Sequence, residues 1–135
     1  MAHHLTDLTI ELEDKPGTVA AAAEALGKAG VNIEGFAGFE TGGKGIAHVL
    51  VEDAQKARQA LQSAGARVTG EQPVIVLELE DKPGSLGSVT RKIANAGVSL
   101  NAVYVATRTR VVIGGKDLEK ARAAVGAATA GQTRK

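Results

Sequence analysis

Alternating apolar and polar positions open the chain. Apolar residues at positions 8, 10 and 12 alternate with polar ones, which predicts a half-buried strand over Leu8–Leu12. Turn residues follow, and apolar residues then return at helical spacing, at Val19, Ala22, Ala23 and Leu26. The chain therefore begins with a strand and a helix, and we expect both apolar faces in one core.

The same reading extends over the next 40 residues. We expect a second strand over residues 32–40, a hairpin turn over Thr41–Gly45 and a return strand over Ile46–Val51. Asp53 can cap a helix whose apolar positions are Ala54, Ala57, Leu61 and Ala64. A short fourth strand over Ala66–Thr69 follows, and the turn-rich segment Gly70-Glu71-Gln72-Pro73 is the expected linker.

A six-residue motif occurs twice. Leu12-Glu13-Asp14-Lys15-Pro16-Gly17 returns as Leu79-Glu80-Asp81-Lys82-Pro83-Gly84, 67 positions later. The register persists, because Ala29-Gly30-Val31 matches Ala96-Gly97-Val98. A second tract, Lys56-Ala57-Arg58, returns at an offset of 64 as Lys120-Ala121-Arg122. The chain is a tandem duplication, and its function should depend on the repeated loop.

The duplication divides the chain into two expected units, residues 1–70 and 71–135. In the second we expect a strand over Val74–Glu80, a helix lined by Leu86, Val89 and Ile93, and a hairpin of Ser99–Ala106 and Arg110–Ile113. Asp117 should start the last helix, after which few residues remain, so the last strand of this unit is expected to be missing or degenerate. Units of about 65 residues bury little surface alone, so the copies are expected to pack together.

Each unit has the order β-α-β-β-α-(β), which is the ferredoxin-like arrangement of the α+β class. The expected sheet order is 4-1-3-2, with antiparallel strands, both helices on one face and strand 2 at an open edge. The topology suggests that two such sheets join edge to edge through strand 2.

Composition narrows the possible functions. The 135 residues carry a net charge of +1, no cysteine and three aromatic residues. Disulfides and thiol chemistry are excluded, and a nucleic-acid partner is not expected because stacking aromatics and a basic face are lacking. No apolar run is long enough to span a membrane, and no secretory signal is visible, so the cytoplasm is the expected compartment.

No catalytic constellation is visible either. Thr18 and Ser85 have no histidine near them in sequence that could act as a base. His3 and His4 are adjacent near the chain start and His48 is read as a lone strand residue, so no metal site or cofactor is expected. Arg108 and Arg110 are read as solvated. We therefore expect a protein that is not an enzyme.

The repeated motif resembles the signature of the ACT domain. An acidic residue, any residue and Pro-Gly precede a helix that ends in Gly-Val-Asn-Ile, here Asp14-Lys15-Pro16-Gly17 and Gly30-Val31-Asn32-Ile33. The second copy reads Asp81-Lys82-Pro83-Gly84 and Gly97-Val98-Ser99-Leu100. The resemblance covers nearly the whole chain, and the chain is similar to small stand-alone tandem-ACT proteins of bacteria.

This resemblance implies ligand-responsive regulation. ACT domains commonly bind amino acids between two paired units, in a pocket between the first β–α loop of one unit and the start of strand 2 of its partner. The implied ligand-binding residues are Asp14, Lys15, Pro16, Gly17, Thr18, Asn32 and Ile33 in the first copy, and Asp81, Lys82, Pro83, Gly84, Ser85, Leu86, Ser99, Leu100 and Asn101 in the second.

The chemistry of these residues agrees with that implication. Free amides at a helix start suit a carboxylate, and a glycine lets a ligand approach the backbone. Asp14, Asp81 or Asn32 could accept an ammonium group, although Asp or Thr could instead cap the helix. Ser99 replaces the asparagine in the second copy and reaches less far, so one pocket is expected to bind better than the other.

Two hypotheses remain open. The first is a regulatory module that binds a free amino acid and acts on a target protein or as a homodimer. The second is a dimerisation or protein-interaction module without a ligand, to which the serine at position 99 and the missing last strand lend some weight. Asp-Lys-Pro-Gly could also be only a turn, and Asn32 only a polar residue at a strand start.

Overall fold

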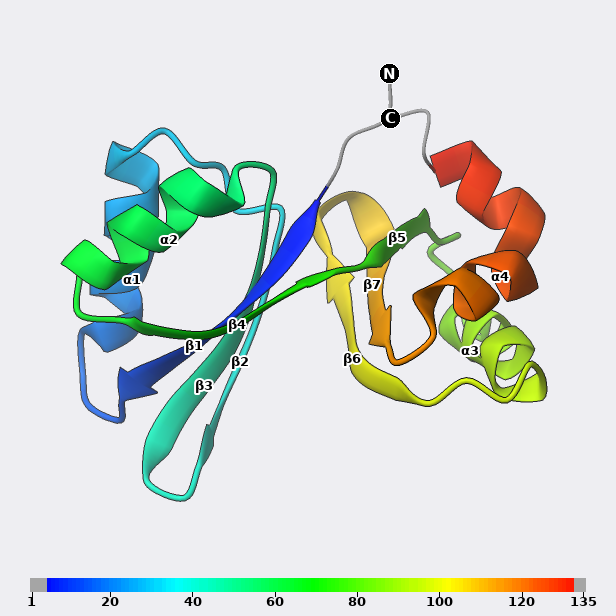
Figure 1. The fold of residues 1–135 in the computed structure, drawn as a ribbon, viewed down its shortest axis with the longest axis horizontal. Coiled ribbons are helices and arrows are strands. Elements are labelled where there is room, and N and C mark those ends of the chain that lie inside the picture. The colour runs from blue at the N-terminus through cyan, green and yellow to red at the C-terminus, as the bar shows by residue number, and fades with distance from the viewer. Residues whose placement is uncertain (1–4, 133–135) are drawn as a thin grey trace. The chain divides into compact units, whose positions relative to one another are not determined.

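The computed structural model describes residues 5–132, with side chains over residues 5–126 (Figure 1). The chain divides into two compact units between Gln72 and Pro73. The first unit ends at Gln72, and the second unit begins at Pro73.

The first unit has the order βαββαβ. Its elements are β1 (Thr6–Glu13), α1 (Thr18–Lys28), β2 (Gly35–Thr41), β3 (Lys44–Val51), α2 (Ala54–Ser63) and β4 (Arg67–Pro73). The strand order β2-β3-β1-β4 confirms the ferredoxin-like topology and leaves β2 at an edge of the sheet.

The core of the first unit lies on one face of this sheet. Leu8 and Ile10 of β1 pack with Leu26 of α1 and Leu61 of α2, and all four side chains are fully or almost fully buried. Burial of one leucine or isoleucine side chain contributes about 1.5–3 kcal/mol. Both helices therefore cover the same face, as the alternating pattern of the first strand predicts.

The second unit repeats this order. Its elements are β5 (Ile75–Glu78), α3 (Ser85–Asn95), β6 (Leu100–Ala106), a 3₁₀ turn (Thr107–Thr109), β7 (Arg110–Gly115) and α4 (Leu118–Gln132). Over the described residues the sheet has the order β5-β7-β6, and Leu77, Ile93, Ile113 and Ala121 are central to its core. Residues 133–135 lie outside the described part, so the fate of a last strand stays a prediction.

Two helices begin as expected. Asp53 accepts a hydrogen bond from the amide of Lys56 at 3.1 Å, and Asp117 accepts one from the amide of Lys120 at the same distance. Each aspartate caps its helix, which confirms the prediction at both copies of this tract.

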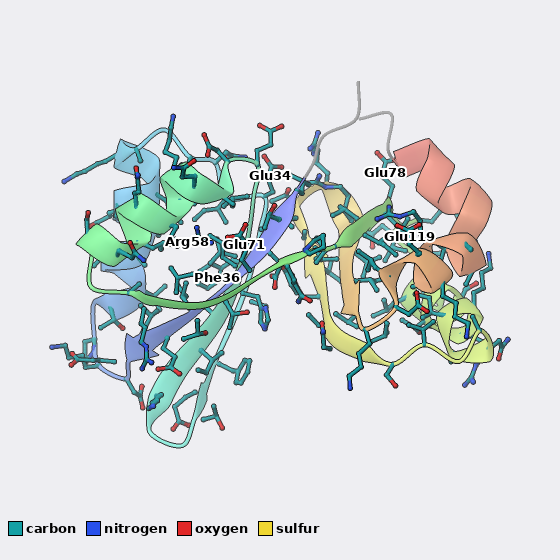
Figure 2. The ribbon with its side chains drawn as sticks, viewed as in Figure 1. Glu34, Phe36, Arg58, Glu71, Glu78 and Glu119 are labelled. Carbon is teal, nitrogen blue, oxygen red and sulfur yellow. The ribbon has the colours of Figure 1, made fainter. Side chains whose placement is uncertain are left out.

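The predicted linker segment contains the boundary between the two units, at Gln72 and Pro73, but it is a strand and not a loop. Gly70–Pro73 is the second half of β4, which lies beside β1. An ion pair from Arg58 of α2 to Glu71 joins this segment to its own unit (Figure 2). A Cβ at Gly70 would lie 3.4 Å from Oγ1 of Thr9 on β1. Pro73 is tolerated because β4 is an edge strand.

Two side chains also depart from the expected pattern. Val19 belongs to the apolar stripe of the first helix, yet in the first turn of α1 it is 52% exposed. Arg110, read as solvated, is buried: its Nε donates to the carbonyl of Thr107 at 2.9 Å and its Nη2 to the Thr107 hydroxyl at 2.7 Å.

Candidate functional site

The loop between β1 and α1 is a tight turn closed by its own backbone. The amide of Lys15 donates to the carbonyl of Glu13 at 3.0 Å, and the Lys15 ammonium pairs with the Glu13 carboxylate at 2.9 Å. Gly17 precedes the helix with φ 92°, a left-handed conformation that favours glycine. The glycine of the motif is thus needed for the backbone to enter α1.

The loop between β5 and α3 has the same geometry. The amide of Lys82 donates to the carbonyl of Glu80 at 2.9 Å, and the two side chains pair at 2.9 Å. Gly84 has φ 92°, as Gly17 does. The repeated sequence therefore encodes a repeated loop conformation in both units.

The expected side-chain caps of α1 and α3 are absent. Neither Gly17 nor Gly84 has a side chain that could accept a hydrogen bond from a helix amide. No other side chain caps these two helices in the described loops. The Thr18 hydroxyl instead donates to the carbonyls of Glu13 and Lys15, at 2.9 and 3.2 Å. The first-turn amides of both helices consequently lack a capping side chain, which suits an anionic group from outside.

A groove of about 490 Å³ runs beside this loop in the first unit. Its apolar lining includes Leu12, Val19, Phe36, Phe39 and Ala47, and Leu12, Phe36 and Ala47 form its floor because they belong to or pack against the core on the helix-facing side of the sheet. Figure 2 labels Phe36, whose strand partner Val49 belongs to the core, so the ring lies on the side of β2 that faces the helices. The volume is in the range of small-molecule sites.

Polar groups gather at the loop end of this groove. Its lining includes Glu13, Asp14, Lys15, Thr18 and Glu40. Among the residues that the structure describes, Asp14 has no side-chain hydrogen bond or ion pair, so its carboxylate is available to a ligand. The Glu40 carboxylate accepts from the amide of Gly43 at 3.1 Å, which fixes it at the hairpin. The groove thus combines an apolar floor with a charged end.

A second hollow of about 600 Å³ shares the loop but has a different lining. Glu11 lies between Lys44 and Arg67, with its carboxylate 3.7 Å from the ammonium and 3.7 Å from the guanidinium. These three charges largely satisfy one another, so this hollow offers less to a ligand than the groove does.

The predicted site residues of the first unit fall at two ends of the sheet. Asp14, Lys15 and Thr18 line the groove, and Pro16 and Gly17 complete the same turn. This turn is near the β2–β3 hairpin, because Glu13 pairs with Lys44. The other predicted residues, Asn32 and Ile33, precede β2 at the opposite end of the sheet.

The residues before β2 are engaged locally. Asn32 donates to the Glu34 carboxylate at 2.9 Å, and Ile33 packs against the core. Within one unit, the structure therefore does not bring them to the loop. The resemblance places them against the loop of a paired unit, and that arrangement stays a prediction.

The second unit distributes its predicted residues in the same way. The loop group comprises Asp81, Lys82, Pro83, Gly84, Ser85 and Leu86. The start-of-strand group comprises Ser99, Leu100 and Asn101, and Leu100 pairs with Gly115 at the end of the sheet away from the loop. The serine carbonyl accepts from the amide of Lys116 at 3.4 Å, and Leu100 packs against the core.

Sequence reasoning missed the walls of the groove. Val19, Phe36, Gly38 and Phe39 were assigned only to a helix or a strand. A usable signal was the comparison of the two copies, because Phe36 and Gly38 correspond to Val103 and Val105 at the offset of 67. The loop sequence is the same in both copies, whereas the residues at these two strand positions differ. Such a difference indicates that the surface beside the loop is not the same in the two units.

A buried polar cluster was also missed. Asp7 is fully buried, and its Oδ2 lies 2.9 Å from His48 Nδ1 and 3.3 Å from Gln72 Nε2. His48 pairs with Thr9 in the β1–β3 register, which places Asp7 diagonally across from it. The 41 positions between Asp7 and His48 in sequence hide the pair, so His48 is not the lone residue that the sequence suggested.

Comparisons with known proteins support the fold. The ACT domain model matches residues 6–66, which include the first repeated motif. Protein BT0572 from Bacteroides thetaiotaomicron has a crystal structure 27% identical to this chain, with a TM-score of 0.77 over 92% of this chain and 88% of that one.

A second similar structure is the ligand-free regulatory subunit of aspartate kinase from Thermus thermophilus. It is 20% identical, with a TM-score of 0.68 over 95% of this chain and 93% of that one. The corresponding subunit from Thermus flavus is 21% identical, with a TM-score of 0.65 over 95% and 94%. The search of curated proteins found no match.

The described residues lack features of a membrane-spanning helix and of a metal site. Within residues 5–132, no helix combines the length and apolar character needed to cross a membrane. In the same part of the chain, no group of three or more histidine, aspartate and glutamate side chains is placed to hold a metal ion. The segment of residues 6–66 thus matches the ACT domain, in a chain with the ferredoxin-like fold that ACT units have.

Proposed function

We propose that this protein is a non-catalytic regulatory module that binds a free amino acid at the β1–α1 loop, and we expect it to act in the cytoplasm. One observation carries the proposal: the loop with Asp14 and Gly17 opens onto a groove whose loop end is charged and whose floor is apolar. A free amino acid is divided in the same way, with charged ammonium and carboxylate groups at one end and its side chain at the other.

The loop offers a partner for each charge of the ligand. The amides of the first turn of α1 have no capping side chain and suit the carboxylate through hydrogen bonds and the helix dipole. The Asp14 carboxylate suits the ammonium. Gly17 leaves the backbone accessible, because no atom lies within 4 Å of the position a Cβ would take.

The likeness to regulatory subunits of aspartate kinase motivates the regulatory part of this proposal. A ligand that binds one conformation better than another shifts the population toward it. We propose that the amino acid does so by completing the contact between paired ACT units, and that a target protein or a second copy responds.

Thermal unfolding against the twenty amino acids tests the proposal. A ligand at 100 times its Kd adds about 2.7 kcal/mol, enough to raise the midpoint by several degrees. Purine nucleotides serve as controls. The variant Gly17→Val should lose the ligand-dependent shift, whereas the control Gly27→Ala, an open position within α1, should keep it. A panel without any shift would refute ligand binding.

The open edge of the sheet favours a second candidate, a ligand-free association module. Strand β2 is an edge strand, and Phe39 on it is 56% exposed. Exposed edges and apolar side chains promote association. Sedimentation of the unliganded protein tests this function: a dimer of fixed affinity, weakened by Phe39→Asp and unchanged by every amino acid, is the expected result. Joining of sheets through their β2-type edges stays a prediction.

A further inference from the structure

The two copies share a loop but differ in the wall beside it. In the first unit, Gly38 of β2 stands opposite Ala47 of β3. In the second unit, the corresponding pair is Val105 of β6 opposite Val111 of β7. The small pair of the first unit is therefore a large pair in the second.

Steric contact with neighbouring side chains, and not backbone conformation, distinguishes the glycine at position 38. Its backbone does not adopt the left-handed conformation that favours glycine, unlike Gly17. Glycine is unfavourable within a strand, and where it persists it often marks the close approach of a ligand or another backbone. A Cβ at this position would lie 3.2 Å from Cε1 of Phe36 and 3.7 Å from Cβ of Ala47. A side chain here would enter the groove and press on its aromatic floor.

The second unit carries that side chain. Val105 points its isopropyl group from the position that Gly38 leaves open, and it is 54% exposed. Val103 replaces Phe36, so the flat aromatic floor is also lost. The loop of the second unit thus keeps its sequence beside a strand that carries valine side chains where the first unit has Phe36 and Gly38.

We infer that the first unit alone carries the amino-acid site, that it takes an amino acid with an apolar side chain, and that Gly38 sets this specificity. This inference rests on the proposed function. The ligand's ammonium lies at Asp14, and its side chain lies over Gly38 on the ring of Phe36. Leu12, Val19 and Ala47 supply apolar lining at this position, and the charged residues of the groove, Glu13, Asp14, Lys15 and Glu40, belong to its loop and hairpin end.

The occupant follows from the distribution of charge. The available carboxylate of Asp14 is at one end of the groove, and the floor is formed by apolar side chains. A ligand that buried a second charge on this floor would lose hydration without a compensating partner. Among the amino acids, valine, leucine, isoleucine and phenylalanine match both ends.

Calorimetric titration with leucine, valine, phenylalanine, lysine and aspartate tests the inference. The unchanged protein should bind an apolar amino acid at one site per chain and at least tenfold more tightly than lysine or aspartate. Gly38→Val, which copies the second unit, should weaken that binding at least tenfold, and Gly38→Ala should weaken it less. Val105→Ala, the control in the second unit, should leave the affinity unchanged.

Circular dichroism of each variant separates a filled groove from a lost fold, and Gly38→Ala provides the graded change if the valine variant does not fold. Binding of a charged amino acid in preference, two equal sites per chain, or affinity that survives both changes at position 38 would overturn the inference while leaving amino-acid binding intact. Failure of all five to bind would overturn the inference, and a flat response to all twenty amino acids would also overturn the proposed function.

Discussion

Gly17 and Gly84 adopt the same backbone conformation, with φ 92° at both and ψ −12° and −11°. They are 67 positions apart, and each is the last residue before a helix. A duplicated glycine motif has thus kept its conformation in both units. The surrounding walls, which this conformation does not constrain, have diverged.

Replacement of either glycine should destabilise its own unit. A Cβ in the left-handed region costs about 1–2 kcal/mol, so Gly17→Ala and Gly84→Ala should each lower the free energy of unfolding by about that amount. Gly27→Ala and Gly87→Ala are matched controls within α1 and α3, where alanine is favoured by about 0.5–1 kcal/mol. Urea denaturation measures all four. Equal effects at positions 17 and 27 would contradict the conformational role.

The aspartates that precede helices should differ in their contribution to stability. Asp53→Ala and Asp117→Ala each remove a hydrogen bond to a helix amide and should cost about 1 kcal/mol. Asp14→Ala should change the free energy of unfolding by less than about 0.5 kcal/mol, because Asp14 caps no helix. The same variant should weaken amino-acid binding. A large stability loss at Asp14 would instead favour a structural role for the loop.

The cluster around Asp7 should be strongly stabilising. Asp7→Ala removes the buried carboxylate that contacts His48 and Gln72 and should cost about 1–3 kcal/mol. A double-mutant cycle with His48→Ala should give a coupling energy of about 0.5–3 kcal/mol. Glu11→Gln on the same strand is the control, since its partners are 3.7 Å away and exposed pairs contribute about 0–1 kcal/mol. Additive losses at Asp7 and His48 would exclude a direct contribution from the pair.

Local patterns predicted most of the fold. The alternation of Leu8, Ile10 and Leu12 and the caps at Asp53 and Asp117 are local signals, and the structure confirms the elements that depend on them. The repeat extends the same interpretation to the second unit. The predicted fourth strand was too short, because Gly70 and Pro73 are residues typical of a linker. Its pairing with β1 is a long-range interaction that no local pattern encodes.

The candidate site was predictable only in part. The motif located Asp14 and Gly17 because the turn that holds them is encoded by neighbouring residues. The opposite wall of the groove depends on which residues of β2 pair with β3. The place of Gly38 in this wall could therefore not be predicted until its pairing with Ala47 was known. The pairing of Asp7 with His48 was missed for the same reason.

Titration of ¹⁵N-labelled protein with leucine, followed by two-dimensional NMR, tests the central claim most directly, because it locates the bound ligand. We predict saturable shifts at the amides of residues 12–19 and 36–47, with smaller changes in the second-unit loop at residues 81–86. Lysine at the same concentration should leave both groups unmoved. Shifts confined to residues outside the groove, or none up to millimolar leucine, would contradict the assignment of the first-unit groove as an amino-acid site.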